Sequence, residues 1–488
     1  MQDFKKLQVW QKSHVWHITE RELYDNLNSL RFALATVFLL GLMLTNAIVH
    51  LREHPKRVQN YHNTVNGYQN RLASYAEDSL YKLAEQGPGY LYKKPSDLRF
   101  CAEGGETFLP SNVEGGFGRW GTGGEPRLES FWILAYHSAT PDLHNVRPNV
   151  TKVDWGFIIG YVLSLIGLLF TFDSISYERE QGTLRLMLAN SIPRHTLLIG
   201  KFLGALISIN IPFTLAVLVN LLVISTSSDV HLGAEAWGRL GFIFFIALLY
   251  TSLFLALGLL VSARVQRSAV SLVMLLLVWV TFVVFMPSTL VSIAGRATLP
   301  KAALGFSERS AQLEDEIERA YYALRYDPDK SLTRIQILQV AGEYVIKDAA
   351  AQERLHEDRL KQRISQVRRA RAITQISPVT IFQHLLESFA GTGFERHLQF
   401  LENVKSYAQQ YRVFIADTDQ ADPESLHIFG VRAGMSQKPV SPEAIPKFED
   451  TLSLSKDFNT AAIELLLLTL FVVVLLSGAY LAFVRVEI

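Results

Sequence analysis

The side chains best suited to bind a partner lie in a short charged segment between two long apolar runs. From Ser176 to Lys201 it reads SYEREQGTLRLMLANSIPRHTLLIGK. Tyr177, Leu184 and Leu188 occupy positions i, i+7 and i+11, which predicts an apolar stripe on a short helix. Charged residues surround the stripe, namely Glu178, Arg179, Glu180 and Arg185. Such a helix either fits a groove on a soluble partner or lies on a membrane as an amphipathic connector.

Patterns typical of enzyme and cofactor sites are absent from the sequence. It contains no GxxxxGK[ST], no HExxH, no GxSxG and a single cysteine, Cys101, so we expect no phosphate-cradling loop and no internal disulfide. His14 and His17 stand three residues apart without a third ligand, which is too little for a metal site. The glycines of 116–121 match the GxGxxG spacing, but we expect no strand before them and no helix after them. We therefore expect neither enzymatic activity nor a cofactor in this chain.

Six stretches free of Asp, Glu, Lys and Arg dominate the hydropathy pattern. Each is long enough to cross a hydrocarbon core, for which roughly 18 to 20 apolar residues suffice. With their boundary residues they predict membrane spans at 32–50, 155–173, 202–225, 240–263, 268–290 and 465–484. The sequence therefore predicts an all-α polytopic membrane protein with six transmembrane helices.

Basic residues flank these spans on one side of the membrane. They are Lys5, Lys6, Lys12, Arg21 and Arg31 before the first span, Arg179, Arg185, Arg194 and Lys201 after the second, Arg264 and Arg267 after the fourth, and Arg485 after the last. Because Lys and Arg accumulate in cytoplasmic loops, we expect the arm 1–31, the segment 174–201 and both termini in the cytoplasm. The expected location is a bacterial inner membrane or a plasma membrane, with 51–154 and 291–464 outside.

The first outward segment, 51–154, begins with a helical seam. Tyr61, Val65, Tyr68, Leu72 and Tyr75 recur at spacings of four and three, which predicts one helix that rises from the membrane and packs against another element. After it the sequence is rich in glycine and proline, with an expected strand at 131–136. We expect a first extracytoplasmic domain with some strand and loop content.

The second outward segment, 291–464, is predicted to be mainly helical. One helix carries Leu313, Ile317, Tyr321 and Leu324 on one face, and a longer helix follows over 332–376, which suggests an antiparallel hairpin. The end of the longer helix is basic, with Arg359, Lys361, Arg363, Arg368, Arg369 and Arg371. These side chains either bind lipid headgroups or an anionic partner, or form a solvated face paired with acids such as Glu357 and Asp358.

Charge limits the remaining classes of function. The net charge is +1, and nucleic-acid binding would require a clearly basic face. The interiors of the six spans hold no Asp, Glu, Lys or Arg that could relay protons or hold a coupling ion. Any work that this protein does must therefore draw its energy from elsewhere.

The run from Asp173 to Lys201 resembles the coupling-helix region of ABC-2-type transporter permeases. In that region an acidic residue, GTL, a basic residue and GK follow in order, here Asp173, Gly182-Thr183-Leu184, Arg194 and Gly200-Lys201. The family often has a proline three residues before the basic residue, where this chain has Ser191, and its proline is Pro193. RELYDNLNSLRF before the first span resembles the family's elbow helix, and 377–400 is similar to a subfamily with large extracytoplasmic insertions.

The resemblance implies the permease subunit of an ATP-driven transporter that exports an unidentified substrate. It implies a second permease subunit, identical or related, and cytosolic ATPase subunits that hold the ATP and Mg. Glu178 and Glu180 would contact the ATPase groove, Gly182 and Thr183 would shape the elbow, and Arg194 and Lys201 would anchor the return to the membrane. Two other readings remain open: spans that drive an extracytoplasmic partner mechanically, and a membrane scaffold or sensor without an ATPase.

Overall fold

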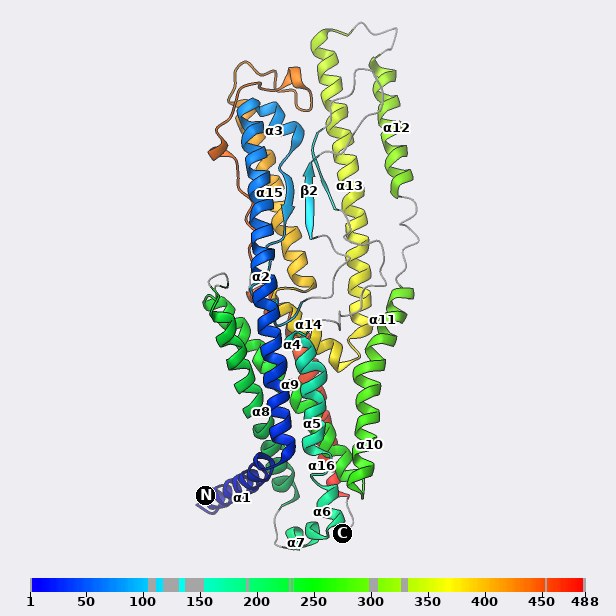
Figure 1. Ribbon diagram of the computed structural model, residues 1–488. Helices are drawn as coiled ribbons and strands as arrows, with labels where there is room; N and C mark the ends of the chain where they lie inside the picture. The colour runs from blue at the N-terminus through cyan, green and yellow to red at the C-terminus, as the bar shows by residue number, and fades with distance from the viewer. Residues whose placement is uncertain are drawn as a thin grey trace.

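The protein is an elongated bundle of helices in which both chain ends lie at the same end (Figure 1). The computed structural model describes residues 2–103, 111–116, 131–136, 153–189, 193–227, 230, 232–297, 306–325, 332–452 and 454–485. In chain order the longer helices are α1 (Gln2–Leu27), α2 (Leu30–Asp78), α5 (Ser164–Thr171), α8 (Arg194–Ser225), α9 (Ala234–Arg264), α10 (Ser268–Trp279), α11 (Met286–Ala297), α12 (Phe306–Arg325), α13 (Arg334–Thr374), α14 (Pro378–Ala390), α15 (Phe394–Gln420) and α16 (Leu454–Val484). The shorter helices are α3 (Leu80–Gln86), α4 (Trp155–Phe157), α6 (Ser176–Glu180), α7 (Thr183–Ala189), and the 3₁₀ turns η5 (Arg432–Gly434) and η6 (Pro442–Ala444).

Six helical stretches in the described part of the chain are long and apolar enough to cross a membrane. They are Leu30–Asp78, Trp155–Glu180, Arg194–Ser225, Ala234–Arg264, Ser268–Leu290 and Ala461–Val484. Each contains one of the spans expected from the sequence, which confirms an all-α polytopic membrane protein. A membrane span must satisfy its backbone hydrogen bonds internally, and a continuous helix does so.

Two spans each contain a π-helical turn. The first, η2 (Ile158–Leu163), lies between α4 and α5, and the carbonyl oxygen of Gly160 in it accepts a 3.0 Å hydrogen bond from the hydroxyl of Tyr250 on α9. The second, η3 (Val280–Phe285), lies between α10 and α11. Pro287 follows it and, because proline has no N–H to donate to the carbonyl four residues earlier, leaves that carbonyl without its usual helical partner.

Helix α14 closes the outer end of the membrane bundle. Its apolar side chains join the same buried cluster as the spans, and it packs against α9 and α16. The ring of Phe382 on α14 stacks on that of Tyr250 on α9, with 4.2 Å between centroids. The helix begins at Pro378, a residue suited to the first turn, and stops where Gly391 takes φ = 65°.

The two segments that the sequence places outside the membrane, 51–154 and 291–464, build one body rather than two separately folded units. Helix α2 continues past the membrane without a break and carries the expected aromatic seam. Buried residues of α2, α3 and the sheet share one hydrophobic cluster with residues of α13, α15 and the 435–445 region. A T-shaped contact between Trp132 and Tyr411, with centroids 5.5 Å apart, lies in this joint core. Neither segment would bury these apolar surfaces alone, which explains why they fold together.

A small antiparallel sheet lies within this body. It consists of β1 (Gly89–Tyr92), β2 (Asn112–Gly116) and β3 (Ile133–Ala135) in that order, and β3 confirms the expected strand. Tyr90 pairs with Glu114, and Glu114 pairs with Ala135. A strand therefore does precede the GxGxxG glycines, contrary to expectation, because β2 ends at Gly116; 117–130 lie outside the described residues.

The expected helical hairpin is present as α12 and α13. Ser310 on α12 donates a 2.8 Å hydrogen bond to Gln352 on α13, and the ring of Tyr321 contacts that of Tyr344. Since the later residue on α12 meets the earlier residue on α13, the two helices are antiparallel. The hairpin stands beside the rest of the outer body, and α13 returns to the membrane bundle (Figure 1).

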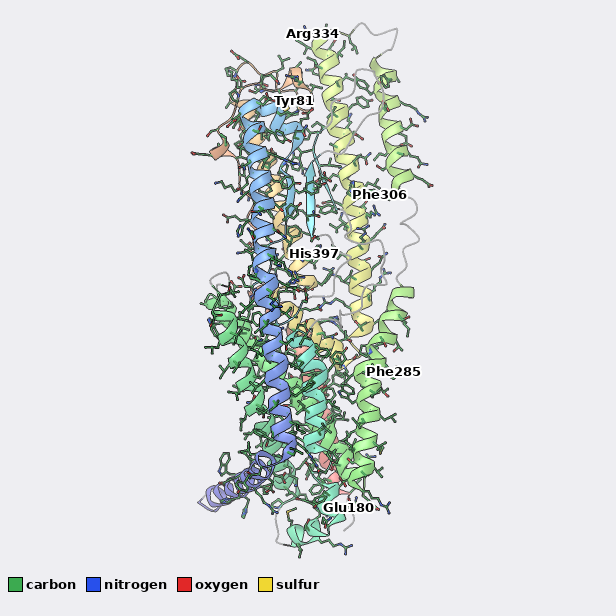
Figure 2. The ribbon with its side chains drawn as sticks, in the orientation of Figure 1. Tyr81, Glu180, Phe285, Phe306, Arg334 and His397 are labelled. Atoms are coloured by element: carbon green, nitrogen blue, oxygen red, sulfur yellow. The ribbon has the colours of Figure 1, made fainter. Side chains whose placement is uncertain are left out.

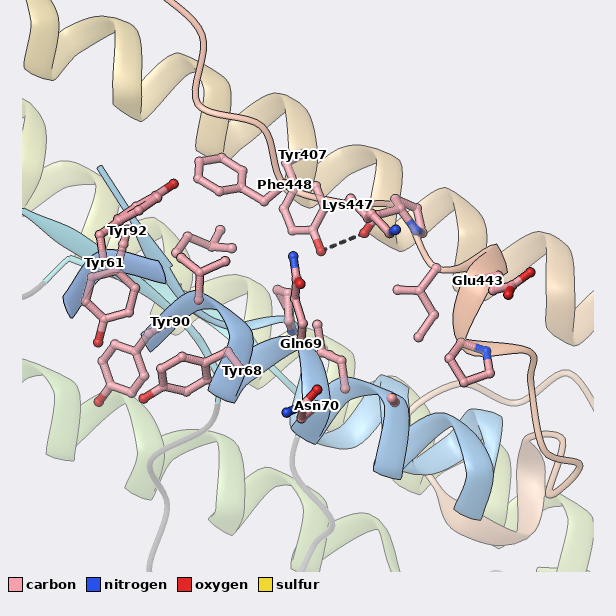
Figure 3. A pocket seen from close by; sticks show the side chains of 18 residues that line it. Tyr61, Tyr68, Gln69, Asn70, Tyr90, Tyr92, Tyr407, Glu443, Lys447 and Phe448 are labelled. Carbon is pink, nitrogen blue, oxygen red and sulfur yellow. Dashed lines mark hydrogen bonds between the residues drawn. The ribbon is translucent and has the colours of Figure 1, made fainter. Parts of the chain in front are cut away.

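A cavity of about 280 Å³ opens between the two outward segments. Figure 3 shows its aromatic wall, where Tyr68 and Tyr90 lie with their ring centroids 5.4 Å apart. Tyr407 and Phe448 face this wall from the second segment, and the Tyr407 hydroxyl donates a 3.0 Å hydrogen bond to the carbonyl of Pro446. Helix α2 therefore forms part of both the membrane bundle and the cavity.

Candidate functional site

Helices α6 and α7 form a bent projection at the end of the molecule that carries the chain termini (Figure 1). The bend falls at Gln181 and Gly182, as the sequence predicts. Gly182 has φ = 75°, and a Cβ atom built on it would meet nothing within 4 Å. The requirement for glycine there is therefore conformational, because other L residues rarely adopt this backbone region. The hydroxyl of Thr183 donates a 3.1 Å hydrogen bond to the carbonyl of Glu178 and closes the turn.

Lys201 joins three helices through one buried cation. Its ammonium, on α8, donates hydrogen bonds to Glu22 on α1 over 2.5 Å and to Glu178 on α6 over 2.7 Å. Only 3% of its side chain is exposed. A buried charge of this kind is stable only when it is paired and hydrogen-bonded. Glu178, which the sequence suggested for a partner's groove, therefore has an internal partner in this structure.

Small residues on α8 allow α1 to pack closely beside it. A Cβ atom on Gly200 would lie 2.6 Å from Ile18, and one on Gly204 would lie 2.6 Å from the Cβ of Glu22. The next residue on this face, Ser208, accepts a 3.2 Å hydrogen bond from Asn26. Spacings of four residues put all three positions on one helix face. The α1–α8 contact thus fixes Glu22 beside Lys201.

Further hydrogen bonds attach the α6 region to α9 and α10, and the start of α8 to α16. The hydroxyl oxygen of Ser262 on α9 accepts 3.0 Å bonds from the N–H groups of Ile175 and Ser176. Glu180 accepts bonds from the N–H and the hydroxyl of Ser268, the first residue of α10. Arg194 donates to the carbonyls of the last turn of α16. The α6 region is therefore bonded directly to α8, α9 and α10, and through α8 to α1 and α16.

Exposed side chains on the projection differ from the stripe expected in the sequence. Tyr177 is 53% exposed, as expected of a docking residue, and Leu186 is 70% exposed. Leu184 is only 2% exposed, because it packs with residues of α8, α9 and α16 in an internal cluster. The bend at Gly182 separates Tyr177 and Leu184 onto two helices, so they share no single face. The side chain of Leu188 lies outside the described residues.

Several residues of this site could not be identified from sequence spacing. Glu22, Ser262 and Ser268 lie far from α6 along the chain, and each is brought to it by a different helix. For Glu22, the sequence offers one signal: it is an acidic residue in the arm before the first span. No group of three or more His, Cys, Asp and Glu that could hold a metal was found within the residues that the structure describes.

The site is thus a surface suited to binding and to transmitting force. Glu180 lies at this end of the molecule (Figure 2), on the same projection as the exposed Tyr177 and Leu186. A family model described as ABC-2 family transporter protein matches residues 16–488. The search of curated proteins found no match.

Proposed function

This chain belongs to the ABC-2 family of transporter proteins, and we propose that it exports its substrate by coupling to ATPase subunits that dock on α6 and α7. As a permease subunit of an ABC transporter, it is a multi-pass membrane protein whose ATPase is a separate partner. The observation that carries the proposal is the exposure of Tyr177 and Leu186 on a projection whose base is bonded to α8, α9 and α10, and through Lys201 to α1.

In the proposed coupling, Tyr177 and Leu186 are the apolar anchors in a groove of the ATPase. Charged side chains beside them, Glu180 and Arg185, would set the register, since charges govern specificity more than affinity. Closure of the ATPase dimer on ATP would push the projection toward the membrane. Lys201 would carry this motion to α1 and α8, and Ser262 would carry it to α9.

We further propose that the chain termini and α6–α7 lie in the cytoplasm. Support comes from the Lys and Arg that flank the spans on this side, and from the large body at the opposite end (Figure 1). Cysteines placed at positions 190 and 350 should then react with impermeant reagents from opposite sides of intact cells. Labelling of both from the same side would contradict this orientation.

A second permease subunit, identical or related, is the proposed neighbour within the bilayer. The fifth and sixth spans bury few residues inside this chain: 17% and 22% of the most apolar 18-residue stretch of each are buried. Such faces meet either lipid or another apolar helix. Two half-pathways placed together would form the route for the substrate.

A mechanical output is the second candidate function. In it, the spans transport nothing and drive the outer body against an extracytoplasmic protein. The continuous α2, which runs from the bilayer to the wall of the cavity, favours this candidate. A scaffold or sensor without an ATPase remains the third reading, and it predicts that no ATPase co-purifies with the wild type.

The docking proposal is tested by replacing Leu186 with aspartate. Burial of a leucine side chain is worth about 1.5–3 kcal/mol, so Leu186→Asp should weaken recovery of the ATPase after gentle extraction by about tenfold or more. Ile335→Asp is the matched control, because Ile335 is also exposed but lies on α13 in the outer body. Equal ATPase recovery by Leu186→Asp and Ile335→Asp, with both proteins in the membrane, would contradict the docking site.

A further inference from the structure

The basic end of α13 contains two exposed arginines for which the structure provides no acidic partner. Three other cations of this stretch have partners: Lys361 pairs with Glu357 and Asp358, Arg359 lies over the ring of Phe306, and Arg371 lies over that of Phe394. Arg363 is half-buried. Arg368 and Arg369 are exposed, and no carboxylate pairs with either among the residues that the structure places. Arg368 and Arg369 can therefore bind an anion that does not belong to the described part of the chain.

The depth of these arginines relative to the bilayer follows from a contact at the end of α13. The amide of Gln375 donates a 3.0 Å hydrogen bond to Glu464, the residue that precedes the charge-free run of the sixth span, 465–484. At about 1.5 Å per helical residue, the backbone of Arg368 and Arg369 is about 9–10 Å above Gln375, and therefore about as far beyond the apolar run.

Long cationic side chains extend toward the membrane surface, so guanidinium groups carried at this height reach the layer of lipid headgroups. A bilayer has a hydrocarbon core about 30 Å thick and a total thickness of about 40–45 Å, which leaves about 5–7 Å of headgroup layer on each side. Helix α13 also contacts α11, which continues the fifth span, so its end stands where lipid meets protein. In Figure 1 the lower end of α13 reaches the level of the outer ends of the spans.

The surface below the arginines is apolar. Ala372 is exposed, and Ile376 is 60% exposed. At 100° per residue Ala372 lies on the side of the helix that carries Arg368 and Arg369, and Ile376 follows in the turn after the helix ends at Thr374. Here an apolar residue lies at the membrane end, and the cations lie one to two turns above it. Segments at a membrane interface have this arrangement, and they extend their charges to the headgroups.

We propose that Arg368 and Arg369 bind the phosphate of an anionic phospholipid in the leaflet on the side of the outer body. Two adjacent guanidinium groups present forked donors that match the oxygens of a phosphodiester. The anionic headgroup supplies the counter-charge that the described chain lacks. Binding there attaches the α12–α13 hairpin to the bilayer, next to the exposed fifth span. This inference does not depend on what the protein transports.

The test measures which lipid the purified full-length chain retains. The protein in mild detergent is mixed with equal amounts of phosphatidylglycerol and phosphatidylcholine of the same acyl chains, and bound lipids are counted by native mass spectrometry. The wild type should retain phosphatidylglycerol in preference. The double variant R368Q/R369Q should lower the ratio of the two lipids by about fivefold for each arginine, the gain expected from one basic residue at an anionic surface.

The matched control is R334Q/R354Q, which removes the same charge from the same helix. Arg334 and Arg354 are exposed, and Arg334 lies at the far end of α13 from the membrane (Figure 2). This control should keep the wild-type lipid ratio, and R368K/R369K should keep part of the preference because the charge remains. An unchanged ratio in R368Q/R369Q, or an equal fall in R334Q/R354Q, overturns the proposal.

Discussion

Lys201 on α8 donates a 2.7 Å hydrogen bond to Glu178 on α6, and the lysine is almost completely buried. The same ammonium reaches Glu22 on α1. One cation thus holds two carboxylates from different helices at the base of the projection that we assign to ATPase docking. Opposite charges in such a place are worth more for fixing geometry than for net stability.

Lys201→Met should destabilise the protein strongly. It leaves two carboxylates facing each other without a counter-ion, and removal of one partner of a buried pair costs about 3–5 kcal/mol. Thermal unfolding of the purified protein, followed by tryptophan fluorescence, measures this loss. Arg21→Met is the control, because the Arg21–Asp25 pair on α1 is exposed and exposed pairs contribute about 0–1 kcal/mol. Equal unfolding temperatures for the two variants would rule out a structural role for Lys201.

Gly204→Ala should weaken the contact between α1 and α8. Its Cβ atom would lie 2.6 Å from the Cβ of Glu22, and such overpacking typically costs about 1–3 kcal/mol. Gly241→Ala on α9 is the matched control, since a Cβ atom there meets nothing within 4 Å and alanine favours a helix over glycine by up to about 1 kcal/mol. We expect a lower unfolding temperature for Gly204→Ala and an unchanged or higher one for Gly241→Ala. The opposite order would contradict close packing at this site.

The loop that follows α15 should loosen in acid. Two hydrogen bonds to its carboxylate lower the pKa of Asp422 from 3.8 to about 2. The larger effect comes from Lys438 and the smaller one from Ser436. A carboxylate with a lowered pKa in the folded state stabilises the fold above its unfolded value, and this contribution is lost as pH falls from about 4 toward 2. Amide hydrogen exchange across 422–438 should therefore lose protection in that window.

Asp422→Asn provides the comparison for this pH effect. In this variant, the amide protection of 422–438 should differ less between pH 4 and pH 2 than it does in the wild type, because the titrating carboxylate is gone. An identical loss of protection in both proteins would show that other groups cause the acid sensitivity of the loop.

Much of the architecture could be predicted because the bilayer imposes it. Charge-free runs of sufficient length leave few alternatives to helical spans, and all six were found where the sequence placed them. The bend at Gly182 was likewise local, since one residue with positive φ determines it. The start of α14 at Pro378 and its end before Gly391 also agree with local preferences of proline and glycine.

Features that depend on distant residues could not be predicted. Glu178 points inward because it binds Lys201, which also binds Glu22. Lys201 and Glu22 lie on other helices, so the spacing of residues around Glu178 could not predict this contact. The seam of Tyr61, Tyr68 and their neighbours indicated a partner for α2 without identifying it. That partner is the second outward segment, more than three hundred residues later in the chain. The two domains expected from the sequence therefore form one body.

The uninterrupted course of α2 has a geometric consequence. Its 49 residues extend about 73 Å at about 1.5 Å per residue. As a rigid lever, a rotation of about 5° about its inner end would sweep its tip through about 6 Å. A small rotation of α2 within the bilayer would thus produce a larger displacement at its far end. There, the tyrosine-lined cavity would widen or narrow with each cycle of ATP hydrolysis by the partner.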